Sequence, residues 1–267
     1  MKRRFVWSLI SIMFISVLIF VFSPAFARNR SLISMFIYDR YQEQGSVQKM
    51  LGYHLDFPLE KMDLYPLMIS YNDSRVSSEL NKDVTFTVEY SFGDFKKDKG
   101  YSRILDFQDP LYNAYIGSYS VLGFGEKMSD ADLADISRFD MTKLALPALG
   151  LEESETSFEI LEQGRYKENH MISGRAFTVY KSTVMTNGSE HAKDDFPADD
   201  LLYGSMDDDP TISFPLRIMK GRIYHHYFEE TDLNLVLFAL GKSEVVLDDF
   251  EELIVNHVRI EFQNQKD

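Results

Sequence analysis

The chain has 267 residues, no cysteine, and 28 Lys and Arg against 42 Asp and Glu, giving a formal net charge of −14 at pH 7. The lack of cysteine excludes disulfides and thiol chemistry, so the fold must rely on its hydrophobic core. The acidity opposes binding to nucleic-acid phosphates and anionic lipids, and it favours cationic partners or ions.

The first 27 residues have the order of an export signal. Basic residues occupy positions 2–4, and an uncharged, mostly apolar run covers positions 5–22. Pro24 follows, and Ala25 and Ala27 supply the small-x-small pattern that signal peptidases cleave. We therefore expect cleavage after Ala27 and a secreted or cell-envelope protein.

A second fate of this segment stays open. Its apolar run of 18 residues is close to the lower limit for crossing a bilayer, so it could remain as a single N-terminal anchor. No later segment is as long and apolar, and we expect contact with a membrane only through this one. Residues 28–267 are long enough for one domain with a full core.

The first half of the mature chain predicts strands followed by a helix. Residues 64–71, 83–92 and 112–124 read as strands, and in 83–92 the apolar side chains alternate with polar ones. An exposed loop at 93–100 is expected to lead to residues 101–107. A helix should begin at Ser129, where the sequence has a capping-box form, and end before Pro147; its core-facing residues are expected to be Leu133, Ile136, Phe139 and Met141.

The second half predicts more strands and a closing helix. Strands are expected at 158–163, 176–185, 211–218, 222–228 and 233–240, with a short joint at 219–221 and a long loop over 190–209. The run 233–240 is almost wholly apolar, as in a central strand. Ser243 should cap a final amphipathic helix that buries Leu247, Phe250, Ile254 and Val258.

These elements predict an α+β fold: an antiparallel β-sheet packed by a mid-chain helix and a C-terminal amphipathic helix. Strands and helices do not alternate regularly, which argues against a parallel βαβ arrangement.

His225 and Glu229 form the first candidate site. On a strand, His225, Tyr227 and Glu229 point to one side, while His226 points to the other. A histidine and a carboxylate two residues apart can share a metal ion or relay a proton, but a zinc site needs a third ligand, which the sequence does not identify. The structural alternative is that His226 packs inside and His225 lies on the exposed face.

An acidic loop is the second candidate. Seven aspartates fall between positions 194 and 209, among them Asp199, Asp200, Asp207, Asp208 and Asp209. Clustered carboxylates can bind Ca²⁺, although the residue order of an EF-hand is absent. The alternative is a solvated loop.

Tyrosines on the expected strand 112–124 are a third candidate. Tyr115 and Tyr119 share a face and could present rings to a ligand, whereas Tyr112 does not align with them. Core packing is the alternative.

The sequence contains neither the G-x-S-x-G nor the H-E-x-x-H motif of common hydrolases. We therefore expect an exported, non-catalytic cell-envelope or extracellular protein that binds a partner or ligand, with no cofactor. The alternative is an exported metal-assisted hydrolase that uses His225, Glu229 and the acidic-loop carboxylates, with Ca²⁺ or Zn²⁺ as the ion.

Overall fold

The computed structural model describes Met13, Ser16 and residues 52–56, 68–71, 74–92, 108–112, 114–148, 153–187, 190–191, 212–213 and 215–262. The proposed leader, apart from Met13 and Ser16, and the seven aspartates of the acidic loop lie outside these ranges. None of the helices within them is long and apolar enough to cross a membrane.

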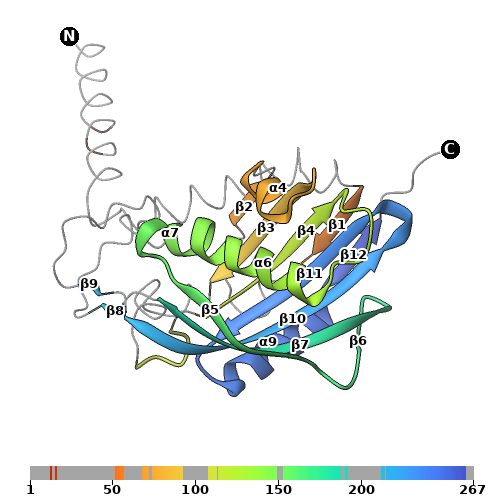
Figure 1. The fold of residues 1–267 in the computed structure, drawn as a ribbon. Helices are drawn as coiled ribbons and strands as arrows, with labels where there is room; N and C mark the ends of the chain where they lie inside the picture. Colours follow the sequence, from red (N-terminus) through yellow and green to blue (C-terminus); the bar gives the residue numbers. More distant parts are fainter. Residues whose placement is uncertain are drawn as a thin grey trace, which may run out of the picture.

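A large antiparallel sheet forms the centre of the described structure (Figure 1). Its strands run in the order β2-β3-β4-β11-β10-β7-β5, with β6 beside β7. Their bounds are Met68–Tyr71 (β2), Thr85–Phe92 (β3), Tyr115–Leu122 (β4), Phe158–Arg165 (β5), His170–Ile172 (β6), Arg175–Asn187 (β7), Leu216–Phe228 (β10) and Leu233–Gly241 (β11). The expected α+β class is confirmed, and the apolar strand β11 lies at the centre of the sheet.

Smaller elements complete the order. Two short antiparallel ribbons pair β1 (Tyr53–Asp56) with β12 (Arg259–Phe262) and β8 (Glu190–His191) with β9 (Ile212–Ser213). The helices are α4 (Ser74–Leu80), α6 (Asp130–Asp140), α7 (Leu146–Ala148) and α9 (Glu244–His257), with a π-helical turn at Met141–Ala145 and 3-10 turns at Glu153–Glu155 and Glu229–Thr231.

Both faces of the sheet are covered, and each carries its own core. Helices α4, α6 and α7 lie on one face, where Leu133, Ile136 and Phe139 pack against strand residues (Figure 1). Helix α9 and the β1–β12 ribbon cover the other face, where Phe250 and Ile254 are buried. Every residue of β11 is buried, because its side chains alternate between the two cores.

Local sequence signals account for the two main helices. Ser129 and Asp132 form the expected capping box: the Ser129 hydroxyl accepts from the Asp132 amide, and the Asp132 carboxylate accepts from the Ser129 amide. Ser243 is the N-cap residue of α9, but its side chain makes no capping hydrogen bond. Glu244 in the first turn instead pairs with Lys220 and Arg222 of β10.

Two expectations about element boundaries are wrong. Residues 216–228 form one continuous strand, so the joint expected at 219–221 does not exist. The helix that starts after Ser129 does not end before Pro147, because the π-helical turn leads directly into α7, which contains this proline.

Candidate functional site

His225 lies in the core on the α6 face of the sheet, with none of its surface exposed. Its Nε2 is 2.9 Å from the side-chain oxygen of Asn234, and its Nδ1 has no hydrogen-bond partner in the described structure. Burial lowers the pKa of His225 to about 4, and the contact with Asn234 opposes this shift only in part. The structural alternative, in which His226 packs inside and His225 is exposed, is therefore wrong: His225 is the buried histidine, and the neighbouring His226 is half-buried.

Glu229 does not share a strand face with His225. Strand β10 ends at Phe228, and Glu229 begins a short 3-10 turn in which it is exposed. The alternation of side chains along β10 therefore ends at Phe228, one residue before Glu229. Within the described ranges, no group of three or more His, Asp or Glu side chains is arranged to hold a metal ion. Asp199, Asp200, Asp207, Asp208 and Asp209 lie outside those ranges.

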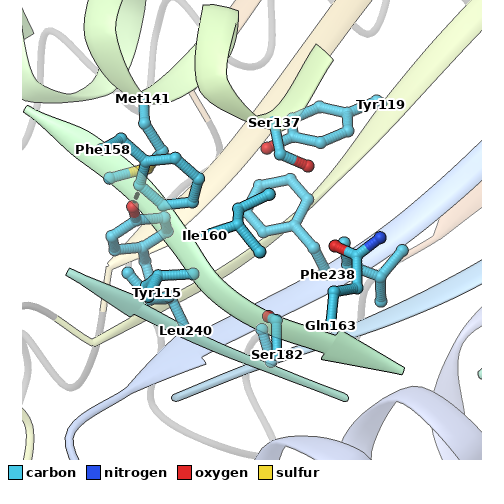
Figure 2. Close-up of a pocket in the computed structure, with 13 residues that line it drawn as sticks. Tyr115, Tyr119, Ser137, Met141, Phe158, Ile160, Gln163, Ser182, Phe238 and Leu240 are labelled. Carbon is cyan, nitrogen blue, oxygen red and sulfur yellow. Dashed lines mark hydrogen bonds between the residues drawn. The ribbon is translucent and has the colours of Figure 1, made fainter. Parts of the chain in front are cut away.

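A small hollow lies between the sheet and the helical layer formed by α6 and the π-helical turn (Figure 2). Its floor follows one cross-strand row, Gln163–Ser182–Gly221–Leu240–Tyr115. Ser182 is the member of this row with a small side chain that lines the hollow. Met141 and Ser137 face it from the helical layer, as Figure 2 shows.

Aromatic and apolar side chains surround this hollow. Tyr119 and Phe238 stack with their ring centroids 4.5 Å apart, and the Tyr115 hydroxyl donates to the Met141 sulfur. The expectation that Tyr115 and Tyr119 share a face is met, because both line the hollow. Tyr112 lies outside β4, in the preceding turn, and is fully buried.

Polar groups without partners lie at and near the hollow. The side-chain oxygen of Gln163, which is one of the lining residues, has no hydrogen-bond partner in the described structure. Close by, Tyr119 donates to Asp140 Oδ2 at 2.6 Å, whereas Asp140 Oδ1 has no partner. Asp140 is fully buried, and burial raises the pKa of its carboxyl well above the ordinary value. The carboxyl group is therefore stabilised in its neutral form.

The hollow is too small for an organic ligand in this conformation. Its volume is about 30 Å³, which is room for about two water molecules. Its polar atoms suit water, because Gln163 offers an acceptor and Ser182 a hydroxyl at the same floor.

A larger groove opens on the opposite face of the same strands. Its volume is about 240 Å³, and Ser182 lines both this groove and the hollow. We call it the charged groove, defined by Glu162, Arg165, Tyr166, Lys181, Arg222 and Glu244. The Lys181 ammonium lies 4.3 Å from the centroid of the Tyr166 ring, a cation–π contact.

Arg222 anchors α9 beside this groove. Only 4% of its side chain is exposed, and it pairs with Glu244 at 3.0 Å, Asp248 at 2.5 Å and Glu251 at 2.9 Å. The three carboxylates are spaced by four and three residues, so they share one side of the helix. These ion pairs hold the first three turns of α9 against β10.

An apolar part of the sheet remains uncovered next to the charged groove. We call it the corner patch, defined by Leu161, Met185, Leu216 and Ile218. Exposed fractions are 47% for Leu161, 49% for Leu216 and 63% for Ile218, and Met185 is half-buried. In Figure 1 the ends of β7 and β10 near β8 and β9 extend past α9.

Strand register places the corner patch on the α9 face. Ile218 pairs with Met185, and Met185 pairs with Glu159 of β5. Ile218 lies four residues from Arg222 on one strand, so both side chains point to the α9 face. A bulge at Leu161 turns this side chain and Glu162 to the same face, because Ile160 and Gln163 both line the hollow on the other face.

Comparison with protein-family models, curated proteins and solved structures gave no match for this chain. Its function must therefore be argued from its own residues. The sequence had pointed to His225 and the tyrosines, but not to the corner patch. In the sequence, Leu216 and Ile218 stand in an apolar segment, residues 214–219, that only Arg217 interrupts, and nothing in this pattern separates exposed from buried positions.

Proposed function

We propose that this protein is an exported, non-catalytic binding protein and that its corner patch is the surface that contacts a partner. The observation that carries the proposal is the exposure of Leu216 and Ile218 on a sheet whose neighbouring surfaces are covered by helices. Clustered apolar side chains on a folded surface mark interaction sites more often than isolated ones do. The adjacent charged groove adds hydrogen-bonding and ionic groups at the rim, as in protein–protein interfaces.

A binding role fits the described polar groups better than catalysis does. The buried titratable side chains, His225 and Asp140, are fully enclosed, so neither meets a substrate in this conformation.

Photocrosslinking of the protein in living cells tests the binding role. A photoreactive phenylalanine analogue is placed at position 218, and a matched control carries it at Met171, which is 58% exposed on β6. We expect one reproducible adduct from position 218 that disappears when Leu216→Ser is added, and none from position 171. Adducts of equal yield from both positions would refute the corner patch as the binding surface.

Export is tested by fractionating the same cells. We expect a processed chain beginning at Arg28 outside the cytoplasm, or an anchored full-length chain in the membrane fraction. A soluble, unprocessed chain in the cytosol would refute export.

A further inference from the structure

We infer that the hollow between the sheet and α6 is a binding site for ordered water, and that Gln163 is the residue that holds the water there. The inference is independent of the corner patch. It concerns the place where β5, the last strand in the order of the large sheet, meets β7 and the helical layer.

Gln163 supplies a buried acceptor. Its side-chain oxygen is buried and has no hydrogen-bond partner in the described structure, whereas its side-chain nitrogen donates to the Asp130 carbonyl at 3.4 Å. A buried acceptor without a partner costs free energy, and almost all such groups in folded proteins bond to protein or to ordered water. The oxygen of Gln163 therefore calls for a donor inside the hollow.

A bulge in β5 aims Gln163 at the hollow. The register with β7 shifts between Ile160 and Glu162, and both Ile160 and Gln163 line the hollow. In a regular strand, residues three positions apart point to opposite faces, so the extra residue is what places both side chains on the same face. A polar side chain is thus turned into a lining that is otherwise mostly aromatic and apolar, and bound water gives this arrangement a purpose.

Two hydroxyl groups complete the site. Ser182 lines the hollow from β7, and Ser137 lines it from α6 (Figure 2). The Ser137 hydroxyl donates to the Leu133 carbonyl at 2.7 Å, so toward the hollow its oxygen serves as an acceptor. Water can donate to Gln163 and Ser137 and accept from Ser182, which is about the number of partners that internal water has in folded proteins.

The size and charge of the hollow select water over other ligands. Its volume of about 30 Å³ has room for about two water molecules and excludes an organic molecule in this conformation. None of the described residues that line it is charged, so it offers no counter-charge to an ion. The hydroxyls of Tyr115 and Tyr119 donate to Met141 and Asp140, which leaves the glutamine and the two serines as the partners of the water.

Crystallography with and without xenon tests the inference on the purified protein. Xenon enters dry apolar cavities, so it distinguishes a dry hollow from a hydrated one. Gln163→Leu replaces the amide by an apolar group of similar size. Glu162→Gln is the matched control, because residue 162 lies beside Gln163 on the same strand and faces the charged groove. In solution, nuclear Overhauser effects from water to the methyl groups of Val184 and Leu240, which are buried in the lining, provide a second readout.

We expect the unaltered protein and Glu162→Gln to show water density within hydrogen-bonding distance of Gln163 Oε1, water signals at both methyl groups, and no xenon. Gln163→Leu should lose this density and most of the water signal. A hollow without water in the unaltered protein, whether empty or occupied by xenon, would overturn the inference. Water that persists unchanged in Gln163→Leu would overturn the role of Gln163.

Discussion

The side-chain oxygen of Asn234 fixes the proton on His225. This oxygen accepts from the Met128 amide at 2.9 Å, and the Asn234 nitrogen donates to the Glu126 carbonyl at 2.9 Å, so the amide cannot be reversed without losing both contacts. His225 Nε2, at 2.9 Å, must therefore be the N–H donor. The proton-free Nδ1 faces the core without a partner. His225 thus supports the loop between β4 and α6 as a neutral donor.

Protonation of His225 should destabilise the protein in acid. Its pKa falls from an unfolded value of 6.5 to about 4 in the fold, so the unfolded chain takes up the proton first as the pH drops. The free energy of unfolding is therefore unaffected by His225 above pH 6.5. It falls between about pH 6.5 and 4, by up to about 3 kcal/mol. Urea unfolding of the unaltered protein and His225→Gln, which keeps a donor to Asn234, measures this difference.

The matched control for this experiment is His226→Gln, which removes the adjacent imidazole. We expect its acid dependence to follow that of the unaltered protein. If His225→Gln loses stability between pH 6.5 and 4 as steeply as the unaltered protein does, the buried neutral histidine is not the cause.

Asp140 should have the opposite pH dependence. Burial raises the pKa of Asp140 above its unfolded value, so the unfolded chain releases the proton first as the pH rises. The stability that depends on Asp140 is therefore greatest at a pH below the pKa of the unfolded chain. It declines as the pH rises toward the pKa of Asp140 in the folded protein. We expect Asp140→Asn to be more stable than the unaltered protein at neutral pH, with a smaller difference in mild acid. Asp135→Asn on the same helix, half-buried and paired with Arg138, is the control, and an equal gain from both variants would contradict the explanation.

Gly221 and Ser182 should be energetically coupled. A Cβ atom added at Gly221 would lie 2.6 Å from Ser182 Oγ, a distance that forces the hydroxyl to move. We expect Gly221→Ala to cost about 1–3 kcal/mol of unfolding free energy, and the cost to fall by about 1 kcal/mol when Ser182→Ala is also present. Additive effects in denaturant unfolding would show that the close approach is not the reason for glycine here.

The metal-assisted alternative makes a separate prediction for Zn²⁺. Nε2 of His225 is committed to Asn234 and the ring is fully buried, so we expect any thermal shift on adding Zn²⁺ to be the same in His225→Gln as in the unaltered protein. A rise in melting temperature that is present only with His225 would instead support the hydrolase alternative. Ca²⁺ added to a variant with Asp207, Asp208 and Asp209 changed to Asn tests the acidic loop independently.

Local sequence signals predicted much of the fold. The capping box at Ser129, the apolar run 233–240 and the helical spacing of Leu247, Phe250 and Ile254 each depend on neighbouring residues, and the structure confirms them. Gly221 was misread as a joint between strands because glycine is common in turns. Its reason is long-range, since Ser182 from another strand occupies the space of its missing side chain.

The site depended more on tertiary arrangement. Alternation predicts which residues share a strand face, but not that both faces of the sheet are covered, so neither the proposed pairing of His225 with Glu229 nor the alternative of an exposed His225 anticipates its burial. The corner patch lies beyond the part of β10 where Arg222 pairs with Glu244 and Asp248 of α9, carboxylates more than twenty residues away in the sequence. Such a relation leaves no pattern within either segment.

Because all nine residues of β11 are buried, a shift in its register with the neighbouring strands would not be tolerated. Sliding this strand by one position against β4 and β10 would send each side chain to the opposite layer, exchanging Leu235 and Leu237 with Val236 and Phe238. A single-codon deletion within it should therefore disrupt both layers at once. For the same reason, its amide protons should be the last in the molecule to exchange with deuterated solvent.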